Sequence, residues 1–424
     1  MNILKLIIKI LIPVIAGALV YFLTDAPGMT AEVAVADFLA TAACEKSLTW
    51  ENDVLNRIKK NGPPSSLIRD IELRTEIDRF ENYEQSFGLQ VKLKGWDEIK
   101  WEKKEYQTGL DKSKIRKEIL FRNALLDRYH IVIEYFHQNR LLQSYEQLLL
   151  VNQDQTSLLE QNMGAIDFDI KKVMDAEQKK ISLEYDIMGI KNKIRLLEKE
   201  IGKWISSQDV ISFSDSKLVS MEKIMKTVSG MDLEDDSSDI FLKQMKLDAK
   251  RAGIEYQKEK SKPWLSFVRL SWDMDEKDDA YKAASVEFGI SLPWFGERDD
   301  VIQEKRITAM IEQNKVNAAE IEQQEKRTAL YGKMMSLIDQ YELLTSNNVM
   351  KMKKGWKQTV EYVGNDQPDL LLFLRRHELE QEIYIINAAH EILEAYIEYL
   401  DLSGKISKAY PVNFLSDDLE EISW

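Results

Sequence analysis

A repeated unit most constrains what this chain can fold into: an alternating strand segment, a long charged helix, a turn and a second helix. The second copy occupies residues 284–404, and landmarks of the first copy precede it at nearly one offset. Phe87-Gly88 and Phe288-Gly289 lie 201 residues apart, the turn glycines Gly164 and Gly364 lie 200 apart, and the end glycines Gly202 and Gly404 lie 202 apart. Self-similarity at a fixed offset indicates a duplicated architecture. The alternative is coincidence, because 17 glycines give some pairs at any offset.

Long stretches free of helix breakers separate these landmarks. Only 17 glycines and 8 prolines punctuate 424 residues, and charged residues make up 31% of the chain. Stretches rich in Glu, Lys, Gln, Leu and Ile favour helix. Such a composition is typical of long solvated helices with narrow apolar seams rather than of two or three compact domains.

Two heptad seams support this interpretation. The first steps by 4 and 3 through Ile115, Ile119, Arg122, Leu126, Tyr129, Ile133 and Phe136, and the second through Leu379, Ile383, Ile386, His390, Leu393, Ile397 and Leu400. A helix over residues 98–151 would span roughly 80 Å at about 1.5 Å per residue. The sequence therefore predicts a rod of antiparallel helices.

Each copy also contains a predicted β-hairpin, over residues 66–94 and 264–293. Apolar and polar residues alternate along both hairpins, which places all apolar side chains of a strand on one face. The predicted apolar face comprises Ile71, Leu73, Ile77, Phe87, Leu89, Val91, Val268, Leu270, Val286, Phe288, Ile290 and Leu292. Length and alternation fit transmembrane barrel strands. A soluble hairpin packed on helices alternates equally well, so that alternative stays open.

The N-terminal residues predict export from the cytoplasm. Lys5 and Lys9 precede an uncharged run over residues 10–23. This run has the length of a signal-peptide core and is short for a membrane span. We expect a signal peptide over residues 1–28, with cleavage after Gly28 or near residues 34–36; an uncleaved anchor is the alternative. Cys44 lacks the Leu-like residue three positions earlier that a lipoprotein site needs, so lipidation is disfavoured.

The remaining boundaries follow from these elements. The first repeat covers residues 29–203, with a helix over residues 31–60, the first hairpin and a helical hairpin over 98–203. An irregular, polar connection covers residues 204–240. The second repeat covers residues 241–404, with its helical hairpin over 297–404, and residues 405–424 form a loose acidic tail.

The order of these elements resembles the TolC-type outer-membrane efflux channels, the outer membrane factors. The run Phe288-Gly289-Ile290-Ser291-Leu292-Pro293-Trp294-Phe295-Gly296 is similar to a strand of that family ending in "G-x-S-x-P-hydrophobic-x-G". Further matches are Tyr362-Val363-Gly364, Leu402-Ser403-Gly404, Met163-Gly164 and Glu200-Ile201-Gly202. Each motif alone is weak, and their order and duplication carry the resemblance. Short hairpin turns resemble most the heavy-metal-cation branch of the family.

The resemblance implies a mainly α fold with small β: duplicated coiled-coil helical hairpins forming an α-barrel, plus four strands per chain in a trimeric outer-membrane β-barrel. It implies a homotrimer in outer membrane lipid with a large periplasmic portion. It also implies a passive duct without cofactors, coupled through a periplasmic adaptor to an inner-membrane transporter. The adaptor-contacting turns would be Met163, Gly164, Val363 and Gly364.

Acidic residues near these turns are candidates for a pore aperture. The family's aspartates six and nine residues after the second turn glycine are replaced here by Leu370 and Phe373. The candidates nearby are Asp167, Asp169, Asp366 and Asp369. A symmetric trimer would triple each charge. The alternative is that these are ordinary acids at helix N-termini, where the helix dipole favours them.

Other function classes are disfavoured. A net charge of −14 argues against nucleic acid as a partner. We expect no metal site, since Cys44 is the only cysteine and the four histidines are scattered along the sequence. Nothing points to a catalytic constellation, so we expect no enzyme. The competing hypothesis is a non-channel periplasmic coiled-coil adaptor or tether.

Overall fold

The structure is a computed structural model of the 424-residue chain. It describes residues 31–63, 65–77, 85–161, 169–205, 211–213, 217–230, 238–261, 265–274, 284–290, 298–346, 368–406 and 412–422.

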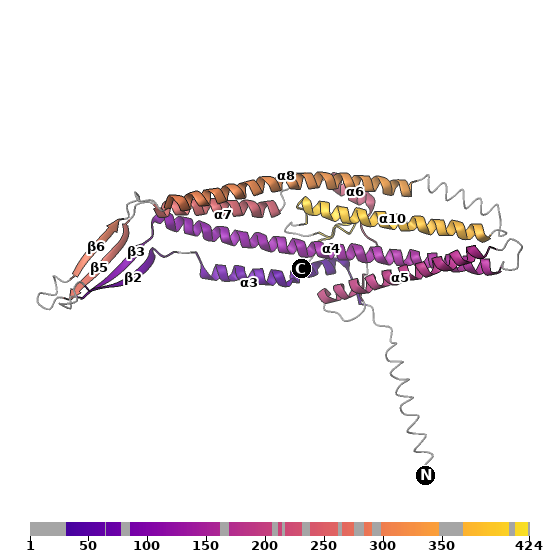
Figure 1. Cartoon of the computed structure of the whole chain (residues 1–424), viewed down its shortest axis with the longest axis horizontal. Helices are drawn as coiled ribbons and strands as arrows, with labels where there is room; N and C mark the ends of the chain where they lie inside the picture. The colour runs from indigo at the N-terminus through magenta and orange to yellow at the C-terminus, as the bar shows by residue number, and fades with distance from the viewer. Residues whose placement is uncertain are drawn as a thin grey trace, which may run out of the picture.

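The protein is an elongated rod with a small β-sheet at one end and helix ends at the other (Figure 1). The helices are α2 (Val35–Ala40), the 3₁₀ helix η1 (Thr41–Cys44), α3 (Lys46–Asn61), α4 (Trp96–Gln161), α5 (Ile170–Ile205), α6 (Met221–Ser229), α7 (Ser238–Ser261), α8 (Arg298–Thr345) and α10 (Pro368–Leu402). The strands are β1 (Ala31–Val33), β2 (Ile68–Ile77), β3 (Gln85–Leu93), β4 (Ile211–Phe213), β5 (Leu265–Met274) and β6 (Ala284–Ile290). Within the described ranges, every helix is too polar or too short to cross a lipid bilayer.

Helix α4 is the central element of the rod. Its 66 residues span roughly 100 Å at about 1.5 Å per residue, and it contacts α3, α5, α7 and α10. The predicted seam is therefore only part of its buried surface. Leu125, Arg128 and Val132 are also buried, because helices pack on several sides of α4 rather than along one stripe.

The predicted heptad seam of α10 is largely confirmed. Leu379, Leu393, Ile397 and Leu400 are buried, and α10 packs against both α4 and α8. The helix predicted over residues 98–151 is longer than expected, at residues 96–161. The first helix of the hairpin predicted over residues 297–404 is described to Thr345, and residues 347–367 lie outside the described part of the chain.

The single helix predicted over residues 31–60 is wrong. The segment contains β1, α2, η1 and α3, and the backbone turns at Glu45, whose ψ of 132° is not helical. Fully buried Arg128 of α4 explains this break: its Nη2 lies 2.8 Å from Oε2 of Glu45, and its guanidinium lies over the ring of Trp204.

The connection and the tail are more ordered than predicted. The connection contains β4, which pairs in parallel with β1, and α6, which buries Ile224 and Val228. In the tail, Leu415 and Ile422 are buried in the same core as Tyr129 of α4. The Tyr129 hydroxyl donates to the Val412 carbonyl at 2.6 Å. The prediction of a loose tail is wrong, because its few apolar residues complete the core around α4 and α6.

Candidate functional site

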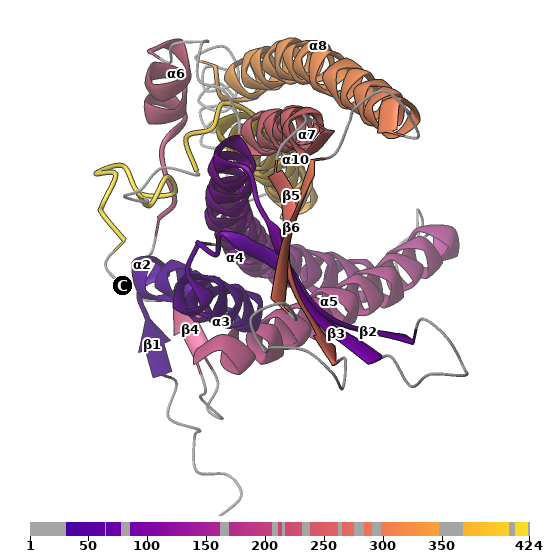
Figure 2. The same cartoon turned by 90° about the vertical axis from the view of Figure 1, so that its left-hand side faces the viewer.

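Strands from both repeats form one antiparallel sheet at the end of the rod. Its order is β2-β3-β5-β6, so β3 of the first hairpin pairs with β5 of the second (Figures 1 and 2). The outer strands β2 and β6 have no second partner strand among the described residues. Within the described part of the chain, β2 and β6 are therefore the edge strands of the sheet.

Strand register places the predicted apolar residues on one face. Ile71, Val91, Val268 and Phe288 form one cross-strand row, and Leu73, Leu89, Leu270 and Val286 form the next. Many of these side chains are exposed: Leu73 is 74% and Phe288 is 66% accessible. Phe87 and Ile290 are exposed as well. Of the other predicted members, the side chain of Ile77 and the whole of Leu292 lie outside what the structure describes.

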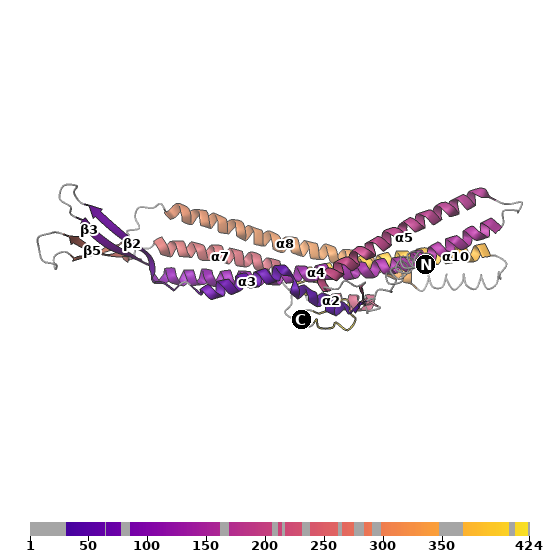
Figure 3. The ribbon, with the colours of Figure 1, turned by 90° about the horizontal axis from the view of Figure 1, so that it is seen from below.

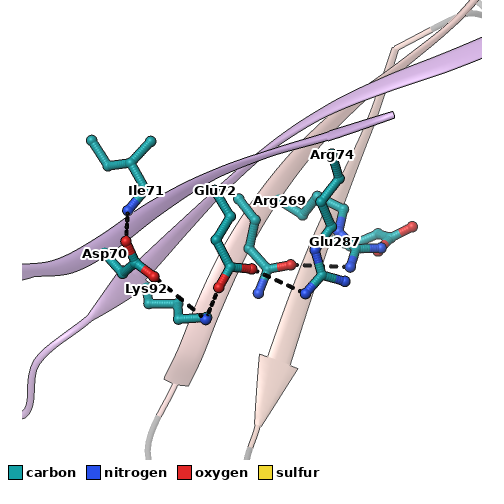
Figure 4. Close-up of polar contacts among 8 residues, drawn as sticks. Asp70, Ile71, Glu72, Arg74, Lys92, Arg269 and Glu287 are labelled. Carbon is teal, nitrogen blue, oxygen red and sulfur yellow. Dashed lines mark hydrogen bonds and ion pairs between the residues drawn. The ribbon is translucent and has the colours of Figure 1, made fainter. Parts of the chain in front are cut away.

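Polar side chains on the opposite face form two hydrogen-bonded groups, one joining β2 to β3 and one joining β3, β5 and β6. Register aligns Glu72, Gln90, Arg269 and Glu287 in one row. Arg269 donates through Nη2 to Oε1 of Gln90 and through Nη1 to Oε2 of Glu287, both at 3.0 Å. Lys92 pairs with Glu72, which also accepts from Arg74 at 3.0 Å (Figure 4).

A water-soluble sheet does not leave rows of large apolar side chains exposed in this way. On the polar face exposure is mixed: Gln90 is only 3% exposed, whereas the side chain of Glu287 is 50% exposed. Burying apolar surface stabilises a fold by about 25 cal/mol per Å², so a sheet of this kind needs an apolar environment on its outer face. An apolar outer face with a polar inner face is the pattern of strands in lipid.

Gly289, part of the motif that carries the family resemblance, has a local structural role. It lies opposite Phe267 in the β5–β6 pair, and the Phe267 ring covers the position that a Cβ of residue 289 would occupy. An aromatic side chain packed across a strand glycine fixes strand register.

Gly289→Ala should therefore destabilise the sheet by about 1–3 kcal/mol, since the added methyl group forces the Phe267 ring out of place. Thermal unfolding of the detergent-purified protein measures this loss. Gly109→Ala in α4 is the matched control, because open space surrounds Gly109 and alanine favours helix. Equal or higher stability of Gly289→Ala would contradict the packing role.

The opposite end of the rod contains the predicted tip, which is only partly described. Met163, Gly164, Asp167, Val363, Gly364 and Asp366 lie outside the described residues. Asp169 precedes α5, and its Oδ1 accepts a hydrogen bond from the backbone N–H of Lys171 at 3.0 Å. Asp369 lies in the first turn of α10. Both positions suit an acid at a helix N-terminus, and an aperture role for either residue stays a prediction.

Basic residues accompany Asp369 at this end. A groove between the C-terminal part of α4 and the N-terminal turns of α5 and α10 is lined by Asp369 and Asp175 together with Lys172, Lys179 and Arg376. The described part of the tip therefore carries both signs of charge.

Two of the histidines that lie far apart in the sequence meet in the middle of the rod. The rings of His137 in α4 and His390 in α10 are stacked with centroids 4.0 Å apart. Oε2 of Glu134 lies 2.9 Å from His390 Nε2 and 3.7 Å from His137 Nδ1. The contact with His137 contributes most and the contact with His390 comes next. Together they hold the pKa of Glu134 well below its usual range. The spacing Glu134-x-x-His137 was the available sequence signal, but no spacing links it to His390.

A neighbouring ion pair joins the same two helices. Nδ1 of His130 lies 2.5 Å from Oε2 of Glu394. The hydrogen bond to Glu394 raises the pKa of His130 above its usual value, although burial opposes the shift, and the charges of Glu394, Glu398 and Asp127 add to it.

A raised folded-state pKa means that protonated His130 stabilises the fold at low pH and that this contribution is lost as pH rises through the folded pKa. The wild type should therefore unfold at a higher temperature than His130→Gln, and this advantage should be larger near pH 6 than at about pH 9. Thermal melts of both proteins across this range measure it. A difference that grows with pH would contradict the assignment.

Comparison with known proteins gives the fold. No protein-family model and no curated protein matches the sequence. The structure is similar to that of CusC, described in terms of folding and transmembrane channel formation, with a TM-score of 0.64 at 11% identity over 89% of this chain and 93% of that one. It is also similar to the outer membrane protein VceC of Vibrio cholerae, with a TM-score of 0.62 at 11% identity over 87% of this chain and 96% of that one. The structure is similar as well to the open state of the MtrE outer membrane channel of Neisseria gonorrhoeae, with a TM-score of 0.61 at 13% identity over 88% of this chain and 89% of that one. The chain therefore has the fold of the TolC-type outer-membrane channels.

Proposed function

We propose that this protein is the outer-membrane channel of a tripartite efflux or export system. One observation carries the proposal: the terminal sheet exposes large apolar side chains along one face and gathers its hydrogen-bonded polar side chains on the other. Lipid is the solvent that suits such a sheet. The fold shared with outer-membrane channels supports the same assignment.

The edges of the sheet support assembly from several chains. Strand edges are not tolerated in lipid, because each unpaired backbone group there costs several kcal/mol. Strands β2 and β6 are the edges of the described sheet. In a homotrimer, β6 of one copy would pair with β2 of the next, which closes a twelve-stranded barrel.

A bare apolar stripe on α5 supports the same assembly. One face of α5 packs on α4 through residues such as Leu183 and Ile194. The opposite face carries side chains that are each more than half exposed: Ile170, Met174, Ile181, Tyr185, Met188 and Leu196. A helix with apolar residues on two opposite faces needs a second partner. A neighbouring copy would supply it, and the helices of three copies would form a hollow cylinder.

Transport through this duct would be passive, with energy supplied by a partner pump. The helix turns around residues 163–164 and 363–364 would contact a periplasmic adaptor joined to an inner-membrane transporter. The protein would lie in the outer membrane with a large periplasmic portion and would have no enzymatic activity. Placement in the heavy-metal-cation branch stays a prediction.

Mass and conductance together test the proposal. The detergent-purified protein should be an elongated trimer by light scattering and negative-stain imaging. In planar lipid bilayers it should give discrete conductance steps. A monomer that is soluble without detergent and gives no conductance would overturn the channel and favour a coiled-coil tether.

A further inference from the structure

The strongest unassigned feature is the cluster formed by Glu134 and His137 of α4 and His390 of α10. One potential ligand atom from each residue lies within 4.8 Å of the other two. All three side chains are neither fully buried nor fully exposed. His390 Nε2 is itself buried and, despite lying 2.9 Å from Glu134, makes no hydrogen bond of acceptable geometry. A buried ring nitrogen that makes no hydrogen bond can bind a metal ion instead.

Hydrogen bonds around the cluster orient its donor atoms. Nε2 of His137 lies 2.9 Å from Oδ1 of Asn387, an acceptor, so Nε2 must carry the proton. A metal ion would be bound through Nδ1 of His137, the nitrogen that faces Glu134, while Nε2 keeps its proton toward Asn387. The second carboxylate oxygen of Glu134 accepts from Nε2 of Gln138 at 2.9 Å. Outer contacts that fix the tautomer of a histidine and the orientation of a carboxylate are typical of metal centres.

We propose that Glu134, His137 and His390 bind a divalent transition-metal cation of the Zn²⁺ or Cu²⁺ kind, which joins α4 to α10. Two imidazoles and one carboxylate form a ligand set that such ions prefer. At metal–ligand distances near 2.0–2.1 Å, tetrahedral ligands lie about 3.3 Å apart. The observed separations of 2.9 and 3.7 Å from Glu134 bracket that value. Water, or Glu394, whose Oε1 lies 3.9 Å from His390 Nε2, completes the coordination.

The position of the cluster gives the cation a structural role. Helix α4 belongs to the first helical hairpin and α10 to the second, so the cation bridges the two halves of the chain. The partly exposed Glu134 leaves a path from solvent. Binding to the folded state alone stabilises that state by mass action. The metal site does not depend on channel function. Metal binding is measured on the purified protein, so its result is separate from the conductance result.

Zinc binding and helix locking test the proposal. The full-length protein in detergent is stripped with EDTA, exchanged into metal-free buffer and titrated with Zn²⁺ by calorimetry. We expect one ion per chain and a higher unfolding temperature with Zn²⁺. Hydrogen exchange should slow in α4 and α10 around the cluster. Cu²⁺ should bind more tightly than Zn²⁺.

Matched variants assign the site. His390→Gln and His137→Gln should each weaken Zn²⁺ binding at least tenfold and abolish the rise in unfolding temperature. His377→Gln is the control, because His377 is on α10 but its Nε2 contacts Gln381 outside the cluster. Circular dichroism of the metal-free variants checks that they fold. Should a glutamine variant misfold, Glu134→Gln, which keeps shape and loses charge, takes its place. Absence of zinc binding by the wild type, or equal loss in His377→Gln, would overturn the proposal.

Discussion

Replacing Val286 with arginine should keep the protein out of the outer membrane, where we propose that it lies. Val286 is on the apolar face of β6, in the row with Leu73, Leu89 and Leu270. An arginine facing lipid costs about 2–4 kcal/mol near the middle of the bilayer, and a homotrimer carries three. We expect little protein in the outer-membrane fraction and accumulation of unassembled or degraded chains. Membrane fractionation with immunoblotting measures this effect.

The adjacent residue provides the control. Ser285 lies on the polar face, where its hydroxyl contacts that of Ser271 at 2.6 Å. Ser285→Arg adds the same side chain to the same strand on the opposite face. It should leave most of the protein in the membrane. If Val286→Arg and Ser285→Arg give the same amount of protein in the membrane fraction, the apolar face of the sheet does not contact lipid. The membrane assignment of this sheet then fails.

Met188→Glu should dissociate the proposed trimer into monomers. Met188 lies within the bare stripe of α5 and is 63% exposed in the single chain. Burying an apolar side chain of this size contributes about 1.5–3 kcal/mol, and a glutamate placed there would have to be desolvated in each of three interfaces. Combining it with Ile181→Glu should increase the effect. Light scattering of the detergent-purified variants measures the mass per particle.

Ser182→Glu is the matched control for the stripe. Ser182 is exposed on α5 next to Ile181 but points away from the stripe, so it adds one charge to the same helix. It should leave the trimer intact. Trimers that persist in the stripe variants would show that α5 does not contact a neighbouring copy, and the interface would then have to involve other helices.

Local patterns in the sequence predicted the four strands of the terminal sheet and most helices. Alternation along residues 68–77 and 284–290 is a property of neighbouring residues, so it is visible without the fold, and the structure confirms both hairpins. The pairing of β3 with β5 could not be predicted in this way. It depends on how two hairpins separated by two long helices meet at one end of the rod.

Contacts between distant residues account for the errors. Tyr129 and Val412 are 283 positions apart, and no periodicity in the tail indicates that the Tyr129 hydroxyl binds there. His137 and His390 likewise come from helices of different repeats, although each fits an ordinary helical pattern alone. The bare stripe of α5 was missed for another reason: its spacing is close to that of the buried seam, and only the packing on α4 shows which face is left uncovered.

The long central helix has a mechanical consequence. Helix α4 runs without interruption from beside the sheet to the far end of the rod and is held by α3, α5, α7 and α10 along its length (Figure 3). Helix α5, by contrast, rests mainly on α4. We therefore expect any widening of the far end to proceed by pivoting of peripheral helices, with α4 acting as the fixed strut that keeps the sheet undisturbed.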